Sequence, residues 1–178
     1  MAGVDEVGRG CLAGPVVAAA VVLPPNVELP GLNDSKKVSA RKRETLNCAI
    51  LAQALSTSIA KVEVQEIDQL NILQASLKAM REAIDGLEIV PNHILVDGHI
   101  QPGTSVEETA LVDGDARSMS IAAASVLAKV YRDRLMVEFD ETYPEYGFAS
   151  NKGYGSPDHL KALHLHGPSP LHRRTFAP

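Results

Sequence analysis

The sequence predicts an α/β protein built around one globular core. Short apolar runs rich in β-branched residues alternate with stretches whose apolar residues recur at helical spacing. Acidic residues stand at the ends of several of the short runs. The 178 residues, of which 45% are hydrophobic and 22% charged, suffice for one domain with a core.

Composition narrows the class of protein. Aromatic residues make up 4% of the chain and Trp is absent, so aliphatic residues must build the core. Cys11 and Cys48 lack metal-type spacing and suggest reduced thiols in a cytoplasmic protein. The net charge of -5 argues weakly against a polyanionic partner, although local basic patches can oppose an acidic metal site.

The first stretch of the chain joins two acids to a glycine-rich turn. Asp5 and Glu6 lie in an apolar segment, where carboxylates are costly unless a cation, usually a metal ion, compensates them. Adjacent strand residues point to opposite faces, so these acids share a site only where the strand twists or ends, as Gly8 permits. Gly8-Arg9-Gly10 then offers amides and one guanidinium to an anion or a sugar. A solvated acid pair before an ordinary turn explains the stretch equally well.

A buried strand is expected next, at about residues 16–23, forming a hairpin with the first strand. The apolar run that contains it is too short to span a bilayer and follows an acidic leader, which argues against a signal peptide. Gly8-x-Gly10-x-x-Ala13 also matches a relaxed dinucleotide-binding fingerprint. That fold needs a helix at this point, whereas the β-branched residues that follow favour a strand.

The remaining elements alternate between the two periodicities. The pattern predicts a helix from Ser39 to about Ala54 with Leu46, Ala49, Ile50 and Leu51 on its apolar side, then a strand at 56–64 and helical spacing from Val64 to Gly86. Strands are predicted at 93–98 and 106–112. A long helix follows from Ser118 or Ser120 to about Glu141, with an apolar stripe of Ile121, Ala124, Ala128, Tyr131 and Leu135, and a last helix runs from Ser156 or Asp158 to His166.

Two further groups of charged residues are candidates for function. Asp97 and Asp115 follow predicted strands, where ligands gather in α/β folds, so they could converge on the first acids. Either acid alone is more often a turn residue or helix cap. An EF-hand at this point fails because the twelfth loop position is Ala124. The densest basic cluster is either a solvated helix entrance or a contact for a phosphate backbone. It comprises Lys36, Lys37, Arg41, Lys42 and Arg43.

His164 and His166 resemble a metal pair, but no other Cys or His has suitable spacing, so surface histidines are favoured.

Motifs over nearly the whole chain resemble those of bacterial ribonuclease HII, the type 2 ribonucleases H. The sister type, ribonuclease HIII, is less similar because it lacks Gly-Arg-Gly. The matching motifs are Gly3-Val4-Asp5-Glu6-Val7-Gly8-Arg9-Gly10, Leu32-Asn33-Asp34-Ser35-Lys36-Lys37, Val96-Asp97-Gly98, Gly114-Asp115, Ser120-Ile121-Ala122-Ala123-Ala124-Ser125, Ala128-Lys129-Val130 with Arg132-Asp133, Lys152-Gly153-Tyr154 and His172-Arg173-Arg174.

The resemblance implies a ribonuclease H-like fold: a mixed five-stranded sheet flanked by helices, with a small helical C-terminal extension. It implies a catalytic domain over residues 1–145 and an extension over 146–178 that packs on it as one functional unit. The implied activity is endonucleolytic hydrolysis of RNA in RNA/DNA hybrids and incision at single ribonucleotides in duplex DNA, leaving 3′-hydroxyl and 5′-phosphate ends. The expected partners are these nucleic acids, with no membrane, and the protein is expected to be a monomer.

The resemblance also assigns the site. Asp5, Glu6, Asp97 and Asp115 match the family's metal-binding and catalytic acids, which hold two Mn²⁺ or Mg²⁺ ions. Gly8-Arg9-Gly10 and Tyr154 match the elements that sense the ribose 2′-OH, and Lys36 and Lys37 are added as substrate contacts. Clustered carboxylates fit this chemistry, because they repel one another unless divalent cations neutralise them.

Two departures from the family pattern stand beside the site. Cys11 replaces the usual Pro, and Asp113 replaces an expected Lys. We expect Asp113 to favour cation binding and to disfavour the scissile phosphate.

Two other classes of function compete with this interpretation. A binding module that had lost catalysis should lack one of the acids, yet all four are present. A different two-metal nuclease on the same fold would explain the acids but not Gly8-Arg9-Gly10 with Tyr154.

Overall fold

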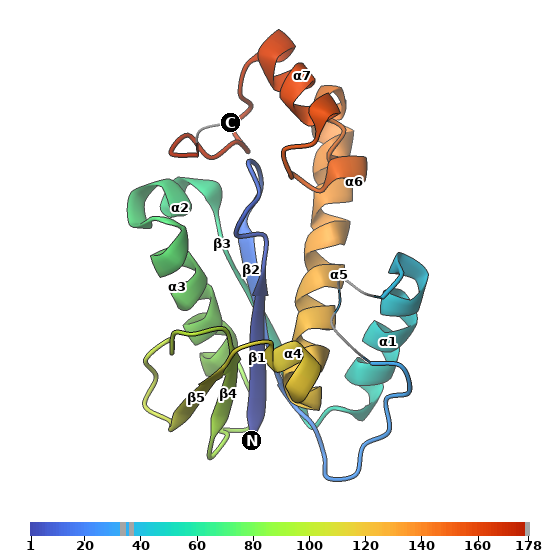
Figure 1. Ribbon diagram of the computed structural model, residues 1–178, viewed down its shortest axis with the longest axis vertical. Helices are drawn as coiled ribbons and strands as arrows, with labels where there is room; N and C mark the ends of the chain where they lie inside the picture. The colour runs from blue at the N-terminus through green and yellow to red at the C-terminus, as the bar shows by residue number, and fades with distance from the viewer. Residues whose placement is uncertain (33–34, 36–37, 177–178) are drawn as a thin grey trace.

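A mixed five-stranded sheet lies at the centre of the fold, as predicted, in the order β3-β2-β1-β4-β5 (Figure 1). The computed structural model describes residues 1–32, 35 and 38–176, so Lys36 and Lys37 lie outside the described residues. The hairpin β1–β2 and the pair β2–β3 are antiparallel, whereas β4 lies parallel to both β1 and β5. The strands are β1 (Ala2–Val7), β2 (Val16–Val22), β3 (Ser56–Val62), β4 (Ile94–Asp97) and β5 (Glu108–Leu111).

The hairpin β1–β2 forms because β2 is apolar along its whole length and buried at every residue. A strand covered on both faces carries a continuous apolar run rather than an alternating one. Asp5 lies opposite Ala19 and Glu6 opposite Ala18. The short alanine side chains leave room beside both carboxyl groups, so the register of this hairpin already favours a polar site at the end of β1.

One face of the sheet is covered by two helices, α2 (Val64–Leu70) and α3 (Ile72–Asp85), where the sequence predicted a single one. The break lies at Asn71, which has a φ of 73° and whose side chain accepts a hydrogen bond from the Gln74 amide at 3.1 Å. Asn tolerates left-handed backbone and caps helices well, so one residue ends the first helix and begins the second.

The other face is covered by α1 (Ala40–Gln53) and the long α5 (Met119–Thr142). Ser39 and Ser118 cap these helices, as predicted. A β-carbon on Gly3 would lie 2.2 Å from the carbonyl carbon of Ser120, which shows how closely α5 approaches β1. The predicted apolar stripes are wrong at Leu51 and Tyr131, which are exposed because the sheet covers only part of each helix.

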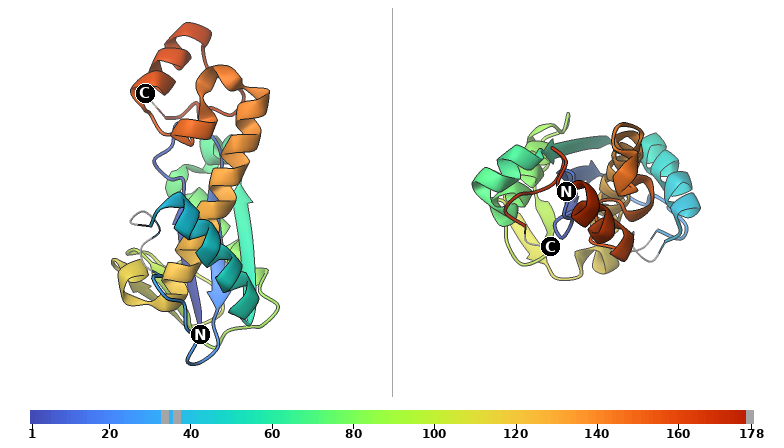
Figure 2. Two further views of the ribbon diagram at one scale, coloured as in Figure 1. Left: turned by 90° about the vertical axis from the view of Figure 1, so that its right-hand side faces the viewer. Right: turned by 90° about the horizontal axis from the view of Figure 1, so that it is seen from above.

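The chain after α5 gathers at the end of the molecule where β1 turns into β2 (Figures 1 and 2). After α4 (Gly114–Arg117) and α5 come a 3₁₀ turn (Pro144–Tyr146), α6 (Phe148–Asn151) and α7 (Pro157–His166). Their small core contains Tyr146 and Phe148 and includes Ala13 from the β1–β2 turn. The segment expected as an extension therefore packs directly against the glycine-rich turn. No described helix is long and apolar enough to cross a membrane.

Candidate active site

Three of the four predicted acids lie close enough to influence one another at the ends of β1 and β4. Asp5 is 6% exposed, and its carboxyl group faces α5, where Ser125 is a hydrogen-bond partner. Glu6 points to the other face and lines a cavity of about 140 Å³ together with Asp97 and residues of α3. Asp5 and Glu6 lie at the end of β1, where their carboxyl groups still interact electrostatically with each other and with Asp97.

Burial controls the protonation of Asp5. Removal from water raises the pKa of Asp5 well above its usual value, and the negative charges of Glu6 and Asp97 raise it further. The hydrogen bond from Ser125 and the one from the Glu6 amide, at 2.7 Å, act in the opposite direction. Ser125 is itself bonded to Ser35, with 2.8 Å between the hydroxyl oxygens. This chain of hydroxyl groups orients the Asp5 carboxyl group.

Glu6 is only partly satisfied by the protein. Burial raises the pKa of Glu6, while the guanidinium of Arg9, 3.1 Å from Oε1, lowers it. Among the described residues, Oε2 of Glu6 is buried without a hydrogen-bond partner. A buried carboxylate oxygen without a partner costs free energy, and a bound cation would remove that cost.

Asp97 is hydrogen-bonded to the residue that precedes Asp115. Oδ1 of Asp97 accepts a hydrogen bond from the Gly114 amide at 2.8 Å, and this amide immediately precedes Asp115 in α4. A β-carbon on Gly114 would lie 3.0 Å from the same oxygen, so glycine permits the contact. Asp115 lines a separate cavity of about 280 Å³ beside Leu29 and Leu32.

The donor set suits a hard divalent cation. Carboxylate oxygens are the ligands that Mg²⁺ and Mn²⁺ prefer, and Glu6 supplies one that is buried without a partner among the described residues. Within residues 1–32, 35 and 38–176, however, no three acidic, His or Cys side chains lie together in an arrangement that could hold a metal ion. Arg9 and Gly114 occupy oxygens of Glu6 and Asp97 instead.

A cavity of about 440 Å³ brings the acids together with cations that the sequence did not single out for the acidic site. Asp5, Glu6, Lys129 and Arg43 line it, with Tyr154 at its edge. Asp133 holds both cations, at 2.7 Å from Lys129 and 3.6 Å from Arg43. Ser125 and Lys129 stand four residues apart on α5, which puts them on one helix face, and this spacing was the available signal. Acidic and basic side chains therefore line one cavity.

Of the predicted substrate-sensing residues, Tyr154 lines this cavity, whereas Arg9 lines the smaller cavity with Glu6 and Asp97. The Arg9 side chain is 51% exposed, and Tyr154 is 40% exposed with the Lys129 ammonium 5.9 Å from its ring centre. Gly8 has a φ of 93°, as expected for a glycine turn. Arg9 and Tyr154 both present side chains to solvent beside the buried acids. The basic residues Arg41 and Lys42 lie at the exposed start of α1.

The four histidines after residue 150 form an exposed pair and a buried pair. His164 and His166 are exposed, in agreement with the prediction of surface residues. His159 and His172 are buried and lie 3.0 Å apart between their Nε2 atoms. The sequence analysis missed this pair, because thirteen residues separate its members and neither stands in a metal-binding motif.

Comparison with known proteins places this chain in a family. Residues 2–178 match the family model described as ribonuclease HII. The ribonuclease HII of Desulfitobacterium hafniense is 56% identical over 178 residues, which is all of this chain and 68% of that protein. A crystal structure of ribonuclease H2 from Pyrococcus horikoshii OT3 superposes with a TM-score of 0.83 at 28% identity, covering 98% of this chain and 92% of that one. The more distant Bst-RNase HIII, crystallised in complex with Mn²⁺, is 16% identical with a TM-score of 0.63, covers 92% of this chain and 69% of that one, and shares the fold. The chain therefore belongs to the ribonuclease HII family, which are endonucleases of the ribonuclease H class.

Proposed function

We propose that this ribonuclease HII hydrolyses the RNA strand of RNA/DNA hybrids and also incises duplex DNA at single ribonucleotides, leaving 3′-hydroxyl and 5′-phosphate ends. The observation that carries the proposal is the cavity lined by Asp5 and Glu6 together with Lys129 and Arg43. Carboxylates bind divalent ions, and the cations attract a phosphodiester to the same place.

Asp5, Glu6, Asp97 and Asp115 are the residues that we propose to hold two Mg²⁺ or Mn²⁺ ions. When bound, such ions activate an attacking water and stabilise the leaving 3′-oxygen. Asp5 and Glu6 have raised pKa values, so in the metal-free protein they retain protons more readily than ordinary carboxyl groups. Ion binding and proton release are therefore coupled in this site. The Asp5 carboxyl group is held by Ser125 and by the Glu6 amide, and it lines the cavity.

Gly8-Arg9-Gly10 and Tyr154 are proposed to distinguish ribose from deoxyribose. The 2′-OH is the group that separates RNA from DNA at a given position, so a turn rich in hydrogen-bond donors suits this task. Tyr154 is exposed enough to stack on a neighbouring sugar and would oppose a second 2′-OH there. Lys129 and Arg43 would then hold the backbone phosphates between these elements and the acids.

The cellular setting and oligomeric state are part of the same proposal. Both cysteines are free, as suits the reducing cytoplasm, and Cys11 is buried. A monomer acting on duplex nucleic acid, with Lys36 and Lys37 as further phosphate contacts, remains our expectation.

Cleavage of three matched duplexes tests the proposal. The substrates are all-DNA, DNA with one ribonucleotide, and an RNA/DNA hybrid, each with Mg²⁺ or Mn²⁺ added. We expect cleavage of the second and third and none of the first. Asp5→Asn should abolish both activities while the protein folds and binds duplex, because the amide keeps the shape of the carboxyl group but not its charge. Near-normal cleavage by folded Asp5→Asn protein would refute the site assignment.

A further inference from the structure

The buried guanidinium of Arg173 binds the backbone carbonyls of the glycine-rich turn. Arg173 is 2% exposed and comes from the last described segment of the chain. Its Nη2 donates to the Gly8 carbonyl at 2.6 Å, its Nη1 to the Arg9 carbonyl at 2.9 Å, and its Nε to the Gly14 carbonyl at 3.0 Å. The Phe176 ring covers the guanidinium, with 4.9 Å between their centres. The planar fork of arginine thus fixes three carbonyl groups of the turn at once.

These contacts decide where the turn amides point. In a trans peptide the C=O and the next N–H point in opposite directions, and the described chain has no cis peptide bond. The Gly8 and Arg9 carbonyls face Arg173, so the Arg9 and Gly10 amides point away from it, toward the surface. Among the described residues, neither amide donates to a backbone carbonyl. The positive charge behind the two peptides also polarises them, which strengthens the outward N–H groups as donors.

The residue before Arg173 reaches the other substrate-sensing element. The Ser169 amide donates to Nδ1 of His172 at 2.9 Å, so the ring proton of neutral His172 must lie on Nε2. This proton is donated to Nε2 of His159 at 3.0 Å, which places the His159 proton on Nδ1. Nδ1 then donates to the Tyr154 carbonyl at 2.7 Å. The two neutral rings form a relay with one consistent direction.

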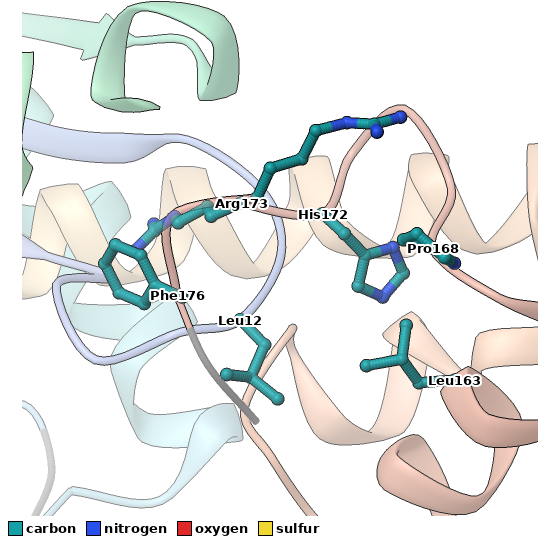
Figure 3. A pocket seen from close by; sticks show the side chains of 7 residues that line it. Leu12, Leu163, Pro168, His172, Arg173 and Phe176 are labelled. Carbon is teal, nitrogen blue, oxygen red and sulfur yellow. The ribbon is translucent and has the colours of Figure 1, made fainter. Parts of the chain in front are cut away.

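His172 and Arg173 lie on one short stretch and project to opposite sides of it (Figure 3). The stretch runs antiparallel to the turn: the Arg173 amide donates to the Leu12 carbonyl at 2.9 Å, and Ala13 pairs with His172 as an isolated bridge. At its far end Asp68 of α2 accepts hydrogen bonds from the Thr175 amide at 3.0 Å and from its hydroxyl group at 2.6 Å.

We propose that His172 and Arg173 are positioning residues that set the spacing between the outward amides of the turn and Tyr154. This inference rests on the proposed function, in which the turn and Tyr154 sense the ribose. Neither residue contacts the buried acids, so their role is in the choice of substrate rather than in hydrolysis. Two elements far apart in sequence must face adjacent sugars of one strand, and adjacent residues on one segment hold both of them.

The test compares Arg173→Lys with Arg174→Lys, a matched change at the exposed neighbour. Each variant is assayed on the single-ribonucleotide duplex and on the RNA/DNA hybrid, and the ratio of the two kcat/KM values is the measurement. A partly unfolded sample lowers both activities equally, so a purely structural role leaves the ratio unchanged. We expect Arg173→Lys to lower the ratio about ten- to a hundredfold, because lysine cannot fix three carbonyls and displaced donors misplace the substrate. Arg174→Lys should not change it.

An unchanged ratio for folded Arg173→Lys protein would overturn the inference. If Arg173→Lys does not fold, Asp68→Ala decides instead, since it loosens the same segment from the surface. A lower ratio then supports the inference and an unchanged ratio contradicts it. Arg9→Ala is measured in parallel: if it retains full selectivity for the single ribonucleotide, the proposed function of the turn fails. If Arg9→Ala loses selectivity for the single ribonucleotide and Arg173→Lys keeps it, only the positioning role of Arg173 is rejected.

Discussion

Substitutions at Gly8 and Gly10 should distinguish the packing of the glycine-rich turn from its contact with substrate. Gly8 has a φ of 93°, and a β-carbon there would lie 2.3 Å from Nε of Arg132. Arg132 cannot move aside easily, because it donates to the carbonyls of Ala13 at 3.0 Å, Pro15 at 3.0 Å and Lys152 at 2.8 Å. Gly10, in contrast, has no heavy atom within 4 Å of an added β-carbon and lies outside the left-handed region.

The two substitutions to Ala should therefore differ in kind. In Gly8→Ala, left-handed strain costs about 1 kcal/mol and the clash about 1–3 kcal/mol, so stability should fall by about 2–4 kcal/mol. For a domain of this size that is roughly 5–15 °C in Tm. Gly10→Ala should change stability by less than about 0.5 kcal/mol. It should nevertheless lose most single-ribonucleotide cleavage, because a substrate that approaches the turn backbone meets the new methyl group.

Thermal unfolding and cleavage of the single-ribonucleotide duplex measure both effects. Gly103→Ala is the control for strain alone, since Gly103 has a φ of 80° and no neighbour within 4 Å of an added β-carbon. The difference in Tm between Gly8→Ala and Gly103→Ala isolates the clash with Arg132. A Gly8→Ala protein with unchanged Tm would refute the packing argument. Full cleavage by Gly10→Ala would show that no substrate group approaches this part of the turn.

Three more outcomes are expected. Tyr154→Ala should reduce cleavage at a single ribonucleotide more than cleavage of hybrids, because hybrids offer many registers. Equal fractional losses of kcat/KM on the two substrates would contradict a sensing role for Tyr154. A lowered Tm of the variant would indicate that Tyr154 contributes to packing. Asp113→Lys should raise the Mg²⁺ concentration for half-maximal activity and lower the substrate KM. Each effect should be about two- to fivefold, because Asp113 is exposed and solvent screens its charge. Superimposable Mg²⁺ titrations of the two proteins, with unchanged KM, would show that Asp113 has no effect on the site. Burial lowers the pKa of His172 from 6.5 to about 4, so its contribution to stability is complete above pH 6.5 and declines toward pH 4. The resulting loss in free energy of unfolding is at most about 3 kcal/mol. Urea unfolding at pH 7 and pH 4.5 should show this loss in the parent protein and a smaller one in His172→Gln. Equal losses in the two proteins would contradict the assignment of the pH dependence to His172.

Much of the fold follows from local patterns. The period of apolar residues predicts β2, α5 and the other long elements, and Ser39 and Ser118 mark the starts of their helices through a hydrogen bond three residues away. The ends of β1 and β4 were likewise visible as apolar runs that stop at acids. These features depend on neighbours within a turn or a strand, so a single sequence contains the information. The break at Asn71 was also local, but helical spacing alone did not reveal it.

The support of the site depends on tertiary contacts that no local pattern predicts. Arg132 and Arg173 belong to a residue type that is usually exposed, and their partners lie up to 165 residues away. A buried guanidinium is stable only where packing gathers several carbonyls around it, and only the folded chain specifies which carbonyls these are. The same holds for His159 and His172, whose tautomers follow from Ser169. The sequence alone thus identifies the groups that we propose to carry out the chemistry, while long-range packing decides how they are aligned.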